Sequence, residues 1–283
     1  MTIQPSSLSG LPRVLFLEAP SSWLTRAALS QGVEVGELLA HLGIGRERDC
    51  DLEFLGPKYR DIQRLCALPA GAFAVTRRII KSVLDLGSTG DRLLLRTVEG
   101  SPIYRVCPSC LSQQQTPYHA IHCRFAAWCY CPLHECLLQA SCWSCQAEIA
   151  LPASLVARGR LEGRCAYLSQ CFGCAKSHCR APLVSLTAVS PFMSSFESDQ
   201  LANGRATLAA LYERRVLLPN GESSTLSELR TVERRGMLAT QRRPLTAEVL
   251  RDRLGQVLGD QANTPAAPQS STQIVRPADT PAL

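Results

Sequence analysis

The chain has 283 residues, of which 46% are hydrophobic and 19% charged, values that are ordinary for a globular protein. No segment reaches the roughly 18 consecutive apolar residues of a membrane span, so we expect no membrane-spanning helix. The net charge of +6, from 30 basic and 24 acidic residues, does not by itself require a nucleic-acid partner.

The N-terminal segment, residues 1–20, is predicted to be irregular. Its apolar run from Val14 to Leu17 is too short for the core of a secretory signal. We therefore expect an intracellular protein whose cysteines stay reduced.

Two short helices joined at Gly32 open a predicted helical, helix-turn-helix-like domain over residues 21–100. Ser21 or Ser22 is expected to cap the first helix with its hydroxyl group. The second helix shows apolar residues at i, i+3, i+4 and i+7, the spacing of one helix face. These residues are Val35, Leu38, Leu39 and Leu42.

The outward face of the second helix decides whether this pair reads DNA. It carries Glu34, Glu37 and His41, without Arg or Lys, and would repel phosphate. A helix hairpin that packs or contacts a protein is therefore favoured over binding in the major groove.

Two further helices are predicted, one from about Lys58 to Leu68 and one after Pro69. The later helix is expected to bury Phe73, Ile80, Val83 and Leu84. Its other side carries Arg77, Arg78 and Lys81. These basic residues are candidate phosphate contacts, although such a run is usually a solvated face.

Residues 101–182 hold twelve of the fourteen cysteines, which predicts a separate tandem zinc-binding module. Four pairs have two residues between their members: Cys107/Cys110, Cys131/His134, Cys142/Cys145 and Cys171/Cys174. That spacing lets a tight turn, here called a knuckle, aim both donors at one ion. Two knuckles complete the tetrahedron that zinc prefers. Four pairs in one stretch favour two structural Zn²⁺ ions over chance or a thioredoxin-like redox motif.

The pairs can join in sequential or interleaved order. Sequential order gives a site of three cysteines and one histidine, then a site of four cysteines. Interleaved order gives a cross-braced, RING-like module. Loop-closure entropy separates them by only about 0.3–0.4 kcal/mol per site. The RING pattern keeps neighbouring pairs a few residues apart, whereas seven residues lie between His134 and Cys142, so sequential order is favoured.

The remaining cysteines are expected to be small buried apolar residues. They are Cys50, Cys66, Cys123, Cys129, Cys136, Cys165 and Cys179. Of these, Cys129 and Cys165 lie close enough in sequence to replace a ligand. Cys179 and the neighbouring His178 compete for the last position of the second site. His119 and His122 are expected to be surface or packing histidines.

The ligand sets are full, which indicates closed structural sites, because a catalytic zinc keeps one position open for water. The chain lacks the H-x-E and P-C-x-x-C motifs of zinc deaminases, an H-E-x-x-H motif and a phosphate-binding loop. We therefore expect no catalytic residues and no enzyme activity.

Residues 183–260 are predicted to form a C-terminal helical domain, and residues 261–283, rich in Pro, Ala and Ser, a disordered tail. The expected helices are marked by Leu201, Leu208 and Leu211, by Leu226, Leu229 and Val232, and by residues 250–258. A further basic group lies between the knuckles of the second site: Arg158, Arg160 and Arg164.

The segments YRVCPSC and PYHAIHCRFAAWCYCPLHECLLQASCWSCQ resemble the TniQ family of bacterial transposition proteins, which includes TnsD. The family's CPxC, CPxH and two CxxC motifs fall on the eight residues of the four pairs. The segments SSWLTRAALSQGVEVGELLAHLG and DIQRLCALPAGAF resemble its opening helices, so the resemblance spans roughly residues 19–175. Where the family has a Trp–Arg step, this chain reads His122-Cys123-Arg124.

The resemblance implies a non-catalytic adaptor for target selection in the bacterial cytoplasm, at the nucleoid. Such adaptors connect target DNA or a CRISPR effector complex to an AAA+ ATPase that recruits the transposase. A homodimer is left open. The alternatives are a RING-like ubiquitin-transfer module and a zinc-containing transcription regulator, which the acidic second helix disfavours.

Overall fold

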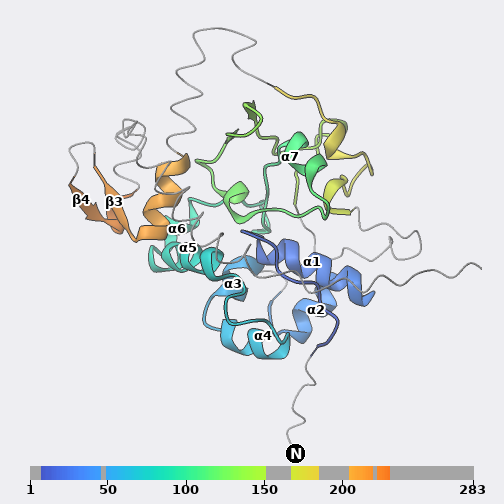
Figure 1. The fold of residues 1–283 in the computed structure, drawn as a ribbon, viewed down its shortest axis with the longest axis horizontal. Coiled ribbons are helices and arrows are strands. Elements are labelled where there is room, and N and C mark those ends of the chain that lie inside the picture. Colours follow the sequence, from blue (N-terminus) through green and yellow to red (C-terminus); the bar gives the residue numbers. More distant parts are fainter. Residues whose placement is uncertain (1–7, 46–48, 151–166, 185–203, 219–221, 230–283) are drawn as a thin grey trace, which may run out of the picture.

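The computed structural model describes residues 8–45, 49–150, 167–184, 204–218 and 222–229. The predicted, mainly helical class is confirmed (Figure 1). The helices are α1 (Pro20–Gln31), α2 (Val35–His41), α3 (Cys50–Leu55), α4 (Tyr59–Leu65), α5 (Ala74–Asp85), α6 (Ser88–Asp91) and α7 (Pro108–Gln113). Residues 204–213 are also helical. None of the described helices is long and apolar enough to span a membrane.

The remaining elements are short. Strands β1 (Tyr130–Cys131) and β2 (Cys136–Leu137) form one antiparallel pair, and β3 (Arg215–Leu217) and β4 (Ser223–Thr225) form another. The 3₁₀ turns are η1 (Ile121–Arg124), η3 (Tyr167–Ser169), η4 (His178–Arg180) and η5 (Leu226–Glu228).

The start of α1 differs from the prediction that Ser21 or Ser22 caps it. The helix begins at Pro20, whose fixed φ suits the first helical position and whose missing N–H leaves one donor fewer to satisfy. Both serines are buried in the first turn, where the Ser21 hydroxyl contacts the Tyr104 hydroxyl. Gly32 ends the helix with a φ of 71°, as predicted.

The acidic residues of α2 have a local role. Glu34 is the N-cap, and the backbone N–H of Glu34 donates to the Glu37 carboxylate at 2.9 Å. The two side chains form a reciprocal capping box, which satisfies backbone donors at the helix start. The negative charge on this helix therefore stabilises its first turn.

Two details of α3 and α5 were not predicted. Asp49 starts α3 by accepting hydrogen bonds from the backbone N–H groups of Asp51 and Leu52. In α5, Ile80 and Val83 are buried as expected, but Leu84 is 37% exposed, so its predicted burial is wrong. The buried face of α5 is centred on Ile79, Ile80 and Val83, which places Leu84 at its margin.

One hydrophobic core continues across residue 100. Its helical part is centred on Trp23, Phe54 and Phe73, whose ring centroids lie 5.3–6.0 Å apart. Tyr104 and Phe125, from the cysteine-rich part, belong to the same core and are fully buried. The loops that carry the cysteines therefore rest directly on the helices (Figure 1).

The helix of residues 204–213 packs against α5 (Figure 1). The Ser82 hydroxyl donates to the Leu211 carbonyl at 2.6 Å, and Arg78 Nε donates to the Tyr212 carbonyl at the same distance. Leu208 and Leu211 are buried in it, as predicted.

The β3–β4 hairpin was not predicted, and residues 226–228 form η5 where a helix was expected. Arg214, with a φ of 63°, turns the chain from helix to strand. Leu201, Val232, residues 250–258 and the tail lie outside the described residues.

Candidate metal centre

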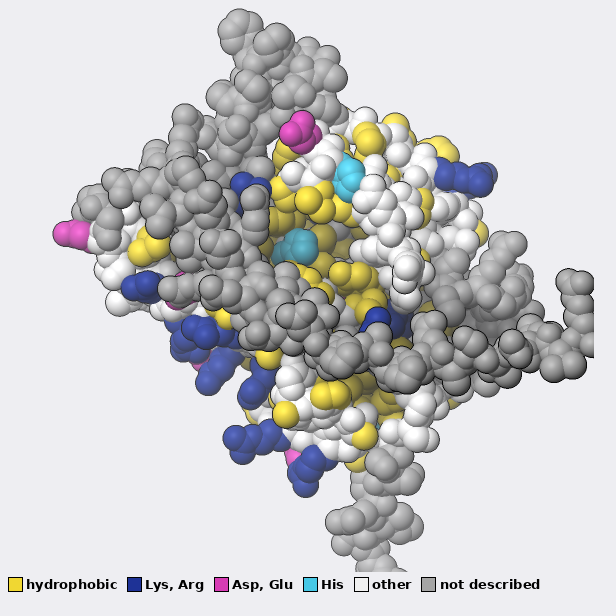
Figure 2. Space-filling model, viewed as in Figure 1, with side chains coloured by type: hydrophobic (Ala, Val, Ile, Leu, Met, Phe, Trp, Pro, Cys, Tyr) yellow, Lys and Arg dark blue, Asp and Glu magenta, His cyan; other side chains and the backbone are white. Residues whose placement is uncertain are grey.

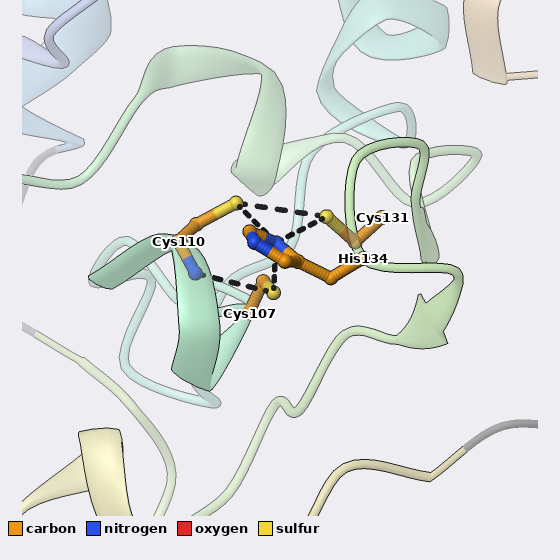
Figure 3. Close-up of side chains that lie close together, drawn as sticks. All are labelled: Cys107, Cys110, Cys131 and His134. Carbon is orange, nitrogen blue, oxygen red and sulfur yellow. Dashed lines mark hydrogen bonds between the residues drawn. The ribbon is translucent and has the colours of Figure 1, made fainter. Parts of the chain in front are cut away.

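Cys107, Cys110, Cys131 and His134 form the first cluster of possible metal ligands (Figure 3). Cys107 is the N-cap of α7, and its sulfur accepts the N–H of Cys110 at 3.4 Å, which holds both thiols at the helix start. Cys131 ends β1, and His134 lies in the turn that leads to β2. A helix start and a hairpin thus supply two donors each.

The distances in this cluster fit one tetrahedral ion. Two sulfurs bound to zinc at about 2.3 Å lie about 3.75 Å apart, and a sulfur and a nitrogen about 3.5 Å. The Sγ atoms of Cys110 and Cys131 are 3.6 Å apart. His134 Nδ1 lies 3.4 Å from Cys107 Sγ, 3.3 Å from Cys110 Sγ and 3.7 Å from Cys131 Sγ.

The second cluster consists of Cys142, Cys145, Cys171 and Cys174. The Sγ atoms of Cys142 and Cys174 are 3.7 Å apart, and those of Cys145 and Cys171 are 3.5 Å apart. The four pairs therefore group in sequential order, which is not the cross-braced arrangement of a RING-like module.

Three of the knuckles share a backbone feature that the sequence did not reveal. Glu135, Gln146 and Ala175, each directly after the second ligand of its knuckle, have positive φ values of 45°, 61° and 58°. Such a conformation usually calls for glycine, which is why no turn signal was visible. Hydrogen bonds hold two of these turns, from Gln146 N–H to the Cys142 carbonyl and from Ala175 N–H to the Cys171 carbonyl.

The crowded donors favour the charged form of one thiol in the first cluster. Hydrogen bonds from the thiols of Cys110 and Cys131 hold the pKa of Cys107 well below its usual range. A thiolate is the form of cysteine that binds metal. Both clusters offer four donors, so each can hold an ion in a closed, structural site.

The residues that competed for the second cluster lie elsewhere. Among the described residues, the cluster includes Cys174 and neither His178 nor Cys179. His178 is buried on η4, which packs against α7, and its Nδ1 has no hydrogen-bond partner among the described residues. Cys165 lies outside the described residues.

His119 and His122 are packing residues. His119 is buried and stacks on Tyr104 with centroids 5.0 Å apart, and His122 meets Trp128 edge to face at the same distance. Burial lowers the pKa of His119 to about 3 and that of His122 to about 4, so both rings are neutral at pH 7.

A buried ion network around Arg124 was missed by sequence reasoning. Arg124, on η1, is fully buried and binds both carboxylate oxygens of Asp49, at 2.9 and 2.6 Å. It also donates to Asp51, which accepts from the Tyr104 hydroxyl at 2.8 Å. The network joins α3 to the segment that leads to Cys131, across 75 residues of sequence.

The candidate phosphate contacts on α5 differ from one another. The Arg77 guanidinium lies over the Tyr59 ring at 4.7 Å and is half-buried. Arg78 is exposed and stacks on Tyr212 at 4.5 Å, and Lys81 is exposed. The other three candidates, Arg158, Arg160 and Arg164, lie outside the described residues.

One part of this chain is similar to a known family. Residues 12–138 match the TniQ family model. This TniQ region runs from the segment before α1 to the residue after β2, so it contains the helices α1–α7 and the whole first cluster, while the second cluster follows it. No curated protein matches the chain.

Proposed function

We propose that this chain is an adaptor for target selection in bacterial transposition. It connects a target, either a DNA site or a CRISPR effector complex, to an AAA+ ATPase that recruits the transposase. The match of residues 12–138 to the TniQ family carries this proposal. The adaptor itself is non-catalytic and acts at the nucleoid, with homodimer formation left open.

Two structural Zn²⁺ ions are part of the proposal. The distances and the donor set of three thiols and one imidazole fit zinc at the first cluster, and four thiols fit it at the second. Zinc would supply cross-links between segments that have little secondary structure. Cys107 and Cys110 would tie α7 to the β1–β2 hairpin, and the second cluster would tie residues 142–145 to residues 171–174.

A basic surface over α4, α5 and β3 suits a phosphate backbone. Figure 2 shows Lys and Arg side chains gathered along one side of the molecule, over these elements. The exposed residues are Arg60, Arg64, Arg78, Lys81, Arg214 and Arg215. Arg64 and Arg214 are paired with Asp61 and Asp85, which reduces their charge toward a ligand. We propose that Arg60, Arg78 and Lys81 contact phosphate. Arg158, Arg160 and Arg164 remain proposed as a second such group.

The test of the adaptor function is co-purification with the AAA+ ATPase encoded beside the transposase. We expect the zinc-loaded protein to retain this ATPase, and target DNA or the CRISPR complex to strengthen the retention. The control is an unrelated AAA+ ATPase. If the intact protein retains neither the neighbouring ATPase nor a CRISPR complex nor DNA, the adaptor proposal is wrong.

The basic surface predicts weak, salt-sensitive binding to DNA. If the protein contacts a few phosphates, its affinity for DNA should fall by roughly one to two orders of magnitude between about 50 and 200 mM salt. The reason is that binding releases counterions from the DNA, and added salt opposes this release. Lys81→Glu should flatten this salt dependence without unfolding the chain, since its side chain is exposed.

The matched control is Arg13→Glu, which reverses one exposed charge in the segment before α1. It should leave the salt dependence close to that of the unchanged protein. Fluorescence anisotropy with labelled duplex DNA measures both. Equal effects of the two variants would show that net charge, and not the α5 surface, governs binding.

A further inference from the structure

A fifth thiol lies against the first cluster. Cys136 is 1% exposed, and its Sγ lies 3.7 Å from the Sγ of Cys107. Its thiol also interacts with that of Cys131, and the three cysteines form a small buried cluster of their own. Neither the motif nor the TniQ match assigns Cys136 a role.

The hairpin register explains why this thiol faces the cluster. Cys136, in β2, lies directly opposite Cys131, in β1. Residues directly opposite in an antiparallel pair send their side chains to the same face. The face on which Cys131 presents its sulfur to the metal site is therefore also the face of Cys136.

The distance from Cys136 to Cys107 is that of two ligands on one ion. Two thiolates on one zinc lie about 3.75 Å apart. The gap of 3.7 Å between Cys107 and Cys136 equals this edge and is close to the 3.6 Å between Cys110 and Cys131, both members of the cluster. A tetrahedral ion takes four donors, so His134 and Cys136 are alternatives for the fourth position.

His134 is a half-buried ligand whose neighbours in the chain are exposed. It lies in the turn of the hairpin between Leu133, which is 77% exposed, and Glu135, which is exposed and has a φ of 45°. Cys136 is instead buried, in strand β2. The half-buried imidazole thus has a buried thiol two residues away along the chain.

We propose that Cys136 is a reserve ligand of the first metal site, which replaces His134 when the imidazole leaves the ion. The inference rests on the proposed zinc site. In this exchange the bond from zinc to the His134 nitrogen breaks and a bond from zinc to the Cys136 sulfur forms. The thiol proton passes to the released imidazole, so the total charge of site and imidazole is unchanged. The site changes from three sulfurs and one nitrogen to four sulfurs and keeps its ion.

The experiment compares His134→Ala, Cys136→Ala, the double variant of these, and a control that joins His134→Ala with Cys123→Ala. Cys123 is a half-buried thiol of the same segment that belongs to neither cluster. Each full-length protein is loaded with Zn²⁺ or Co²⁺ and then challenged with a chelator. Metal content and the sulfur-to-cobalt charge-transfer absorption are measured, and circular dichroism reports whether each variant is folded.

The unchanged protein should bind two ions through seven sulfurs, three in the first cluster and four in the second. His134→Ala should keep both ions, and its charge-transfer absorption should rise by one sulfur in seven. The Cys123 control should behave in the same way. The double variant should hold its first ion at least about tenfold more weakly than His134→Ala, because no fourth protein ligand remains.

Two results would overturn the reserve ligand. One is loss of the first ion from His134→Ala to the same extent as from the double variant. The other is retention of that ion without added sulfur absorption, which would mean that water fills the fourth position. Fewer than two ions on the unchanged protein would instead contradict the proposed zinc sites themselves. The ion of the second cluster serves as an internal reference in every variant.

Discussion

Cys107→Ser is expected to yield protein that lacks the first zinc ion and collects in the insoluble fraction. Serine is a poor zinc ligand, and Cys107 also caps α7. Structural zinc contributes about 10–16 kcal/mol in small zinc peptides, whereas a whole domain is stable by only about 5–15 kcal/mol. Loss of one thiolate therefore removes a contribution as large as the stability of the fold. Cys142→Ser should have the same consequence at the second cluster.

The matched control is Cys129→Ser, a half-buried cysteine outside both clusters, which should stay soluble with two zinc ions. Elemental analysis and the soluble fraction after expression measure the outcome. One zinc ion or none on the unchanged protein, or a soluble Cys107→Ser variant with two ions, would contradict the structural role.

The grouping of the knuckles was predictable because it depends on short-range spacing. Two residues between donors fix each knuckle, and seven residues between His134 and Cys142 favour sequential order. The last ligand of the second cluster was predicted as Cys174, but spacing alone left His178 and Cys179 as competitors. Whether Cys174 or His178 completes it depends on η4, which packs against α7, more than 60 residues earlier in the chain.

The helices were predictable where apolar spacing and glycine stops agree. Val35, Leu38 and Leu39 are buried on α2, and Gly32 and Gly43 have positive φ values. The six residues of α3 are too few for a periodic pattern, and the three-residue strands β3 and β4 are shorter still. Such short elements take their stability from tertiary contacts, which a local pattern does not contain.

The same reason hid the function of Asp49 and Arg124. Asp49 looks like an ordinary cap for α3, and Arg124 like one more arginine on a basic chain. Only the fold brings them together, 75 residues apart in sequence. The ion network that results connects the cysteine-rich segment to the start of α3.

Arg124→Met is expected to destabilise the TniQ region by about 3–5 kcal/mol, because it leaves buried carboxylates without their cation. Arg124 is fully buried, as is Asp51, and Asp49 is 9% exposed. Arg96 also binds Asp49, at 2.9 Å, but its other ion pair is with Asp91, at 3.0 Å, and its side chain is partly exposed. It therefore does not replace Arg124 at Asp51.

The Asp49 carboxyl determines how the effect of Arg124→Met on stability changes with pH. Burial alone would raise the pKa of Asp49, but Arg124, with help from Arg96, holds that pKa below its usual value. A carboxyl with a lowered pKa stabilises the fold above its unfolded pKa of about 4, and this contribution is lost as the pH falls further. Without Arg124 the Asp49 carboxylate keeps the energetic cost of burial. The free energy of unfolding of Arg124→Met should therefore be lowest at neutral pH, and it should fall less than that of the unchanged protein when the pH is lowered.

Two further variants separate the ion network from simple loss of packing. Adding Asp51→Asn to Arg124→Met should recover part of the lost stability, because one buried negative charge disappears with the positive one. Arg64→Met, which breaks a surface pair with Asp61 whose side chains are 81% and 65% exposed, should change stability by less than about 1 kcal/mol. Urea unfolding followed by circular dichroism, at pH 7 and at pH 5, gives the three free energies. If Arg124→Met costs no more than Arg64→Met, or if Asp51→Asn makes the variant weaker still, the buried network does not hold the cysteine-rich segment on the helices.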